Sequence, residues 1–135
     1  MASPGRGARI KGHNFEREIA KMLSEATGSE FERGLGQARH GGSENSDVRS
    51  DEFPEFHFEC KRHKKCNIKE AVRQAKKDIE DSKESRIPII VTKDDREEIL
   101  VTMTMTDWLK FFQAYIDEPL LVKGLLECSG TKAET

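Results

Sequence analysis

The chain has 135 residues, enough for one domain with a modest core, and 36% of them are charged. It contains no run of about 18 apolar residues, so we expect no membrane partner. Its net charge of −2 argues weakly against nucleic acid, and its three irregularly spaced cysteines argue against a disulfide framework. We expect a cytoplasmic protein, in the host cytoplasm if a phage encodes it.

The N-terminal third predicts an arm, a helix and a loop. Residues 1–11 are basic and glycine-rich, which is typical of a flexible arm without the apolar stretch of a signal peptide. Asn14 is suited to cap a helix that Gly28 would end. Its apolar residues recur at helical spacing: Phe15, Ile19, Met22, Leu23 and Ala26. A short strand at 29–33 and a mobile, glycine-rich loop at 34–46 are expected to follow.

The middle of the chain predicts a hairpin and a crossover helix. Phe56, Phe58 and Cys60 alternate with polar residues, which indicates a strand over 56–61 with Val48 on its hairpin partner. Apolar residues from Ile68 to Ile79 predict an amphipathic helix whose other face is basic. The apolar run 87–91 suits a strand covered on both faces.

The C-terminal part predicts a strand at 99–105 and a helix capped by Thr106 or Asp107. A leucine-rich segment at 119–126 and a disordered tail at 127–135 follow. The order of elements predicts an α/β fold, with a central mixed β-sheet of about five strands flanked by helices. We assign residues 12–126 to a single domain.

The motif with the most chemical content is Glu59-Cys60-Lys61. Side chains two residues apart on a strand share a face, so Glu59 and Lys61 point the same way. Asp47 precedes the partner strand, so its carboxylate could lie beside that of Glu59. Two adjacent carboxylates repel each other, and a divalent cation such as Mg²⁺ relieves the repulsion. The alternatives are a cross-strand ion pair for Glu59 and Lys61, and an ordinary loop acid for Asp47.

Glu16 is the third candidate acid, because a helix packed on the sheet could aim it at the same metal. Its alternative is a surface position in the cluster Glu16-Arg17-Glu18.

Basic residues cluster despite the net charge, so we expect a phosphate-binding surface. The alternatives are a solvated helix face, a disordered loop and, for the glutamine, a simple exposed position. The candidate DNA-binding residues are Arg9, Lys11, Arg17, Arg33, Arg39, Ser43, Lys64, Lys65, Lys69, Arg73 and Gln74.

Three blocks in order resemble the archaeal-type Holliday junction resolvases of the PD-(D/E)XK nuclease superfamily. The first is the helical opening at 11–23, KGHNFEREIAKML, and the others are Ser46-Asp47-Val48 and Phe58-Glu59-Cys60-Lys61. The resemblance covers residues 11–61, and beyond them only the order of elements is similar. The chain departs from the family pattern after Asp47, where Val48 is followed by polar residues.

This resemblance implies a restriction-endonuclease-like fold and a homodimer that cuts branched DNA, in which each active site nicks one strand of a four-way junction. It implies Mg²⁺, for which Mn²⁺ substitutes, and no small-molecule cofactor. Asp47, Glu59 and the backbone carbonyl of Cys60 would bind the metal, with Glu16 acting through water. Lys61 would position or polarise the attacking water.

Other interpretations stay open at this point. His57, Cys60, His63 and Cys66 recur every three residues, which invites a zinc site. The chain could also be a non-catalytic nucleic-acid-binding module, or another PD-(D/E)XK enzyme such as an exonuclease, a nickase or a restriction-like endonuclease. The aromatic segment around Trp108 and Phe112 could form a dimer interface or simply pack in the core.

Overall fold

The structure is a computed structural model, and it describes residues 4–34, 46–118, 124 and 127. Contacts within the chain divide it into two compact units, Met1–Met103 and Thr104–Thr135, and each is described by itself. Within the described residues, no helix has the length and apolar character needed to cross a membrane. The assignment of residues 12–126 to one domain stays a prediction.

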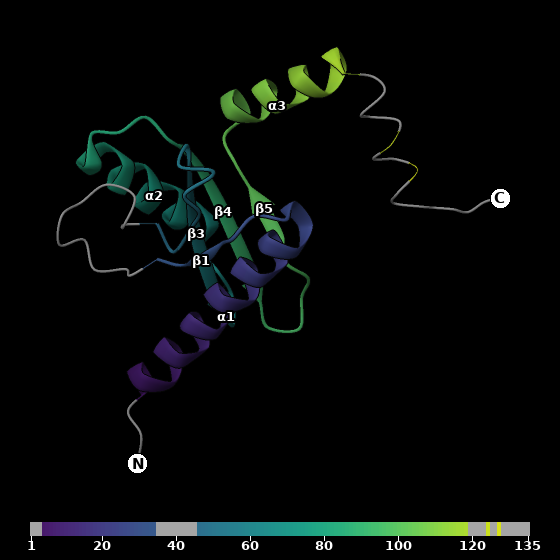
Figure 1. The fold of residues 1–135 in the computed structure, drawn as a ribbon. Helices are drawn as coiled ribbons and strands as arrows, with labels where there is room; N and C mark the ends of the chain where they lie inside the picture. Colours follow the sequence, from purple (N-terminus) through teal and green to yellow (C-terminus); the bar gives the residue numbers. More distant parts are fainter. Residues whose placement is uncertain (1–3, 35–45, 119–123, 125–126, 128–135) are drawn as a thin grey trace. The chain divides into compact units, whose positions relative to one another are not determined.

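The first unit is built on a five-stranded mixed sheet in the order β1-β2-β3-β4-β5 (Figure 1). The strands are β1 (Glu32–Arg33), β2 (Val48–Arg49), β3 (Phe56–His63), β4 (Ile87–Asp94) and β5 (Leu100–Thr102). Only the β3–β4 pair is parallel, and α2 (Ile68–Ser82) connects these two strands as a crossover. The predicted mixed, restriction-endonuclease-like α/β fold is therefore confirmed.

The two helices of this unit cover opposite faces of the sheet, as the two separate hydrophobic clusters show. α1 (Pro4–Thr27) buries Phe15 and Ile19 against Phe58, Cys60 and other residues of the sheet. α2 buries small residues, Ala71 and Ala75, against Ile90 of β4. Because side chains alternate along β3, Phe58 and Cys60 face α1. The alternating residues His57, Glu59 and Lys61 face α2.

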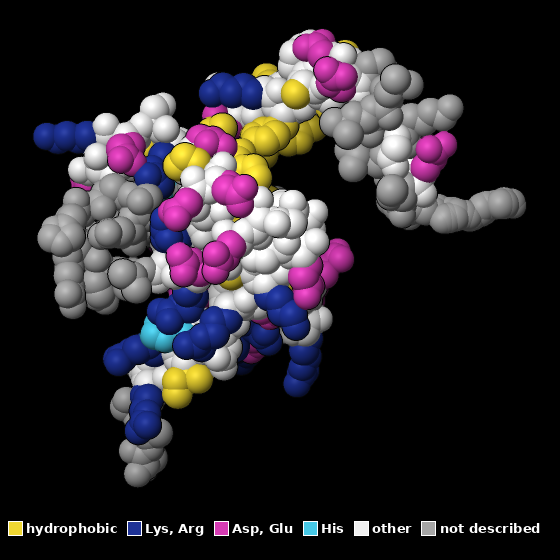
Figure 2. All heavy atoms as spheres, in the orientation of Figure 1, with side chains coloured by type: hydrophobic (Ala, Val, Ile, Leu, Met, Phe, Trp, Pro, Cys, Tyr) yellow, Lys and Arg dark blue, Asp and Glu magenta, His cyan; other side chains and the backbone are white. Residues whose placement is uncertain are grey.

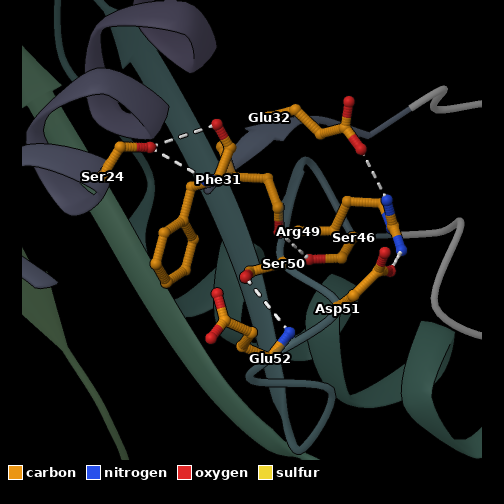
Figure 3. A network of polar contacts seen from close by, with 9 residues as sticks. Ser24, Phe31, Glu32, Ser46, Arg49, Ser50, Asp51 and Glu52 are labelled. Carbon is orange, nitrogen blue, oxygen red and sulfur yellow. Dashed lines mark hydrogen bonds and ion pairs between the residues drawn. The ribbon is translucent and has the colours of Figure 1, made fainter. Parts of the chain in front are cut away.

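Short strands at one edge are joined by polar contacts that Figure 3 shows. The Arg49 guanidinium lies between two carboxylates, donating to Glu32 at 2.7 Å and also to Asp51. On the neighbouring side, the backbone N–H of Phe31 donates to the hydroxyl of Ser24 at 2.8 Å, which ties α1 to the start of β1. These contacts hold β1 and β2 in register although each strand spans only two residues.

Helix starts differ from the sequence prediction. Residues 4–11, expected as a flexible arm, form the first turns of α1, and Asn14 lies inside that helix instead of capping it. Proline suits a first helical turn because its fixed φ matches the helix and no partner is needed for its missing N–H. α2 is capped by Asn67, whose side chain accepts a hydrogen bond from the Glu70 N–H at 3.0 Å.

The second unit contains α3 (Met105–Asp117), which is capped by Thr104, not by Thr106 or Asp107. None of its residues is buried, and its large apolar side chains are exposed. Trp108 stacks on Phe112 with ring centroids 4.8 Å apart. Figure 2 shows hydrophobic side chains gathered on this helix. Core packing, one of the two predicted roles of this segment, is not seen in the described residues; the predicted leucine-rich segment 119–126 lies mostly outside them.

Candidate active site

β3 supplies two of the predicted site residues. Glu59 and Lys61 extend from the face opposite Phe58 and Cys60, as the alternation predicted. The Glu59 side chain is only 5% exposed, and its Oε2 atom lies 3.1 Å from Nζ of Lys61. A buried carboxylate needs such a partner, because desolvation without compensation is costly.

Asp47 is held next to β3 by its own backbone and side chain. Its N–H donates to the carbonyl of Phe58 at 2.8 Å, and its Oδ2 atom accepts from the N–H of Cys60 at 2.8 Å. The preceding Ser46 is fully buried, and its hydroxyl accepts from the Phe58 N–H at 2.8 Å and donates to the Val48 carbonyl at 2.6 Å. The Ser46 hydroxyl therefore takes the place of a backbone group in the β2–β3 hydrogen-bond ladder. This leaves Asp47 beside the Glu59-Cys60-Lys61 segment.

Gly34 allows the chain to pass close to the backbone of Ser46 and Asp47. Its N–H donates to the Asp47 carbonyl at 2.8 Å. A Cβ atom at position 34 would lie 1.9 Å from the backbone oxygen of Ser46, closer than any real contact. The close approach of these two backbone segments thus requires glycine.

The electrostatics of Asp47 are unusual for a carboxyl group. Burial raises its pKa to about 8, the nearby carboxylates of Glu59 and Glu16 add to this rise, and the Cys60 N–H and Lys61 oppose it. No described residue forms an ion pair with Asp47. Asp47 thus carries a negative charge at neutral pH only at a cost, unless a cation joins it.

The pKa values of Lys61 and Cys60 are both raised, which keeps the lysine charged and the thiol neutral. Burial disfavours the charged ammonium of Lys61, but the Glu59 carboxylate outweighs it, so that the pKa of Lys61 is raised. Lys61 therefore remains a cation and a proton donor. Burial, with Asp47 and Glu16 adding to it, raises the pKa of the Cys60 thiol well above its usual range, so its side chain is an inert part of the core.

Glu16 reaches the same region from α1. Its carboxylate contributes to the raised pKa of Asp47, and its side chain is 15% exposed. Arg33 of β1 donates from Nε to Oε1 of Glu16 at 2.8 Å, which fixes that side chain beneath the site. The fold therefore brings Glu16 of α1, Asp47 beside β2 and Glu59 of β3 within electrostatic range of one another, and their role at a metal site stays a prediction.

The residues present fit a divalent cation. Within the described residues, Glu59 and Glu16 lie close enough to Asp47 to raise its pKa; Lys61 pairs with Glu59 and Arg33 pairs with Glu16, which leaves Asp47 without an ion-pair partner. Carboxylate and carbonyl oxygens are the ligands that Mg²⁺ and Mn²⁺ prefer. Asp47 and Glu59, with the backbone carbonyl of Cys60 that follows Glu59, would hold such an ion, and Glu16 would lie in its outer shell.

Comparison with protein families agrees with this geometry. Residues 7–123 match the model of a family described as "Phage putative PDDEXK endonuclease". The chain belongs to this family. A search of curated proteins returned no match, and a search of solved structures returned none either.

Not all the basic residues predicted to bind DNA are free in this PD-(D/E)XK chain. Arg33 is engaged with Glu16, and Lys11 donates to Asp95 at 2.7 Å. Gln74 donates to Asp78 at 3.1 Å, close to the site, and is not an isolated surface residue. Arg39 and Ser43 lie outside the described residues. The exposed basic residues among them are Arg9, Arg17, Lys64, Lys65, Lys69 and Arg73, of which Arg73 pairs with Glu70.

The proposed zinc site is not formed. Cys60 packs in the core on the α1 face, whereas His57 lies on the α2 face with its side chain 1% exposed. Cys66 is a free thiol that contacts backbone carbonyls of Lys61 and Lys93. Strand alternation separates His57 from Cys60, so their three-residue spacing does not produce a cluster.

Two features of this candidate site were missed from the sequence. Asp78 of α2 reaches the vicinity of Glu59, and Arg33 holds Glu16. Helical spacing places Asp78 four residues after Gln74, on one side of α2. That spacing was the only signal for Asp78, and nothing in the sequence pointed to the Arg33–Glu16 pair.

Proposed function

We propose that this protein is a Mg²⁺-dependent DNA endonuclease that resolves four-way junctions by paired nicks, with Mn²⁺ able to replace Mg²⁺. The observation that carries the proposal is the convergence of Asp47, Glu59 and Glu16 beside a protonated Lys61. Membership of an endonuclease family supports phosphodiester hydrolysis. The choice of a junction rests on the resemblance of residues 11–61 to junction resolvases.

Each residue has a physical role in phosphodiester hydrolysis. Water attacks phosphorus, and the bond to one sugar oxygen breaks. The bound cation would supply Lewis acidity and lower the pKa of water near the phosphate. Asp47 and Glu59 hold that cation, and Lys61, kept charged by Glu59, stabilises negative charge that develops on the phosphate oxygens. Glu16 orients water at the site while Arg33 keeps its side chain in place.

DNA would contact the exposed basic residues. Arg9 and Arg17 lie on α1, and Lys64, Lys65 and Lys69 lie at or near the start of α2. Figure 2 shows Lys and Arg side chains concentrated on the N-terminal half of α1. Because these contacts are to phosphates, affinity should fall steeply as salt rises.

Paired nicks need two active sites, so we propose a homodimer. The exposed apolar side chains of α3 support it, since contiguous exposed apolar surface is typical of an interaction site. Sedimentation as a monomer at micromolar concentration would contradict paired cutting.

A substrate panel tests the proposal. The full chain is incubated with a labelled four-way junction, the matched linear duplex and the single strand, in Mg²⁺ and in EDTA, with Asp47→Asn alongside. We expect symmetric nicks in the junction only, abolished by EDTA and by the variant. Metal-dependent cutting of linear duplex at the same rate would retain the nuclease and reject the junction. Junction binding without cleavage of any substrate would favour a non-catalytic module.

A further inference from the structure

His57 is a buried imidazole with an unsatisfied nitrogen. Its side chain is 1% exposed, and its Nε2 atom has no hydrogen-bond partner among the residues that the structure describes. That atom lies 3.7 Å from Oε1 of Glu59, too far for a hydrogen bond. A buried polar atom without a partner is costly, so a ligand between Nε2 and Oε1 would remove a penalty that the fold otherwise carries.

Asp78 completes a set of three ligand atoms. It extends from α2 toward β3, and one ligand atom from each of His57, Glu59 and Asp78 lies within 4.8 Å of the others. Gln74 donates to Oδ1 of Asp78 at 3.1 Å, an outer contact that orients the carboxylate. Asp78 is partly exposed, which leaves an entry path from solvent.

The separations match a shared metal ion. Two atoms that each lie about 2.1 Å from one ion are about 3 to 4.2 Å apart, depending on the angle between the bonds. The 3.7 Å between His57 and Glu59 falls in this range, and a small rotation of the Asp78 side chain would bring its oxygen in. The two carboxylate oxygens of Glu59 have different partners: Oε2 pairs with Lys61, and Oε1 faces His57.

Charge also leaves room for a cation here. Among the described residues, Lys61 pairs with Glu59 and also interacts with Asp78. One ammonium cannot neutralise both carboxylates. An imidazole nitrogen with two carboxylates is a ligand set that favours transition ions such as Mn²⁺ or Zn²⁺ over Mg²⁺, which prefers oxygen ligands alone.

We propose that His57, Glu59 and Asp78 form a second metal site, selective for a transition metal ion, beneath α2. The site shares Glu59 with the Asp47 site and rests on the proposed function only through that shared residue. Glu59 would bridge two ions, so occupation of the second site would fix its carboxylate for the first.

Mn²⁺ alone is the probe, counted by electron paramagnetic resonance on the full chain. We expect two ions per wild-type chain and one per Asp78→Asn chain, with the lost ion bound about tenfold or more weakly. Asp81→Asn is the matched control, because Asp81 lies on the same helix but is exposed and pairs with Lys77. It should retain two ions.

His57→Gln tests the nitrogen ligand directly, and its fold is checked by its circular dichroism. Because a buried variant can fail to fold, Asp78→Asn remains the deciding variant. Millimolar Mg²⁺ should displace one Mn²⁺ from the wild type and leave the ion that depends on Asp78. One Mn²⁺ per wild-type chain, lost in Asp47→Asn and unchanged in Asp78→Asn, would overturn the second site and leave the nuclease site intact. Failure of the nuclease proposal would be seen separately, as absence of DNA cleavage with the Mn²⁺ counts as expected.

Discussion

The carboxylate of Asp47 accepts a hydrogen bond from the backbone N–H of Cys60 at 2.8 Å. Cys60 stands between Glu59 and Lys61, so this one bond ties the aspartate to the middle of the Glu-Cys-Lys segment. It also places a partly buried carboxylate where Glu59 repels it. The metal-free fold thus contains a local electrostatic cost that a bound cation removes.

Asp47 should make the stability of the metal-free protein depend on pH. Its folded-state pKa of about 8 lies above the unfolded value of about 3.9, so the folded chain binds the extra proton between these values. The contribution of Asp47 to the free energy of unfolding is fully present below about pH 4 and is lost as pH rises through about 8. Denaturation in EDTA should show wild-type stability falling across this window relative to Asp47→Asn.

Saturating Mg²⁺ should remove that difference, because the ion stabilises the charged aspartate. At pH 7, binding should release up to about one proton per chain, measured by calorimetry in buffers of different ionisation enthalpy. Parallel pH profiles for wild type and Asp47→Asn in EDTA would show that Asp47 is not perturbed.

Glu16→Gln should slow cleavage without weakening DNA binding. Arg33 holds the Glu16 carboxylate 2.8 Å from its Nε, so the substitution removes charge from the outer part of the metal site and leaves the basic surface alone. Loss of an outer contact of this kind typically costs about 10- to 100-fold. Single-turnover cleavage and a binding titration measure the two effects. Glu18→Gln, exposed on the same helix, is the control and should cut at the wild-type rate.

Ser46→Ala should destabilise the protein by about 1–3 kcal/mol. The substitution leaves the buried N–H of Phe58 without its acceptor, and an unsatisfied buried donor costs about this much. Urea denaturation of the variant measures the loss. Ser85→Ala, at an exposed position, should change stability by less than about 0.5 kcal/mol. Equal stabilities for the two variants would contradict the role given to Ser46.

Gly34→Ala should be more damaging than its size suggests. The new Cβ would meet the Ser46 backbone oxygen at 1.9 Å, and backbone cannot move aside as a flexible side chain can. We expect both a lower melting temperature and slower cleavage, since Asp47 would be displaced. Gly12→Ala is the control, because no described residue lies within 4 Å of its Cβ position and alanine favours a helix. A melting temperature for Gly34→Ala at or above that of Gly12→Ala would rule out the close approach.

Much of the fold follows from local sequence patterns. Alternation in β3 predicted which side chains face the core, and helical spacing predicted the buried face of α1 that includes Phe15 and Ile19. The apolar run at β4 indicated a strand covered on both faces, as found with Val91 and Ile90 in separate clusters. These features depend on residues close in sequence, so one chain is enough to infer them.

Contacts between distant residues were harder to foresee. The Arg33–Glu16 pair joins positions 17 residues apart, and charge alone suggested that Arg33 would face DNA. Asp78 approaches Glu59 only because the β3–α2–β4 crossover lays α2 on that face of the sheet. The first turns of α1 were missed because glycine at positions 5, 7 and 12 lowers helix propensity without preventing a helix.

The most direct test of the account is single-turnover junction cleavage in Mg²⁺ by Glu59→Gln, with Glu55→Gln as an exposed control just before β3. Glu59 pairs with Lys61, raises the pKa of Asp47 and belongs to both proposed metal sites, so both proposals depend on it. We predict a loss of about 10³-fold or more for Glu59→Gln, since metal and charge stabilisation supply several kcal/mol, and no loss for Glu55→Gln. A folded Glu59→Gln protein that cuts at the wild-type rate would contradict the assignment of this site.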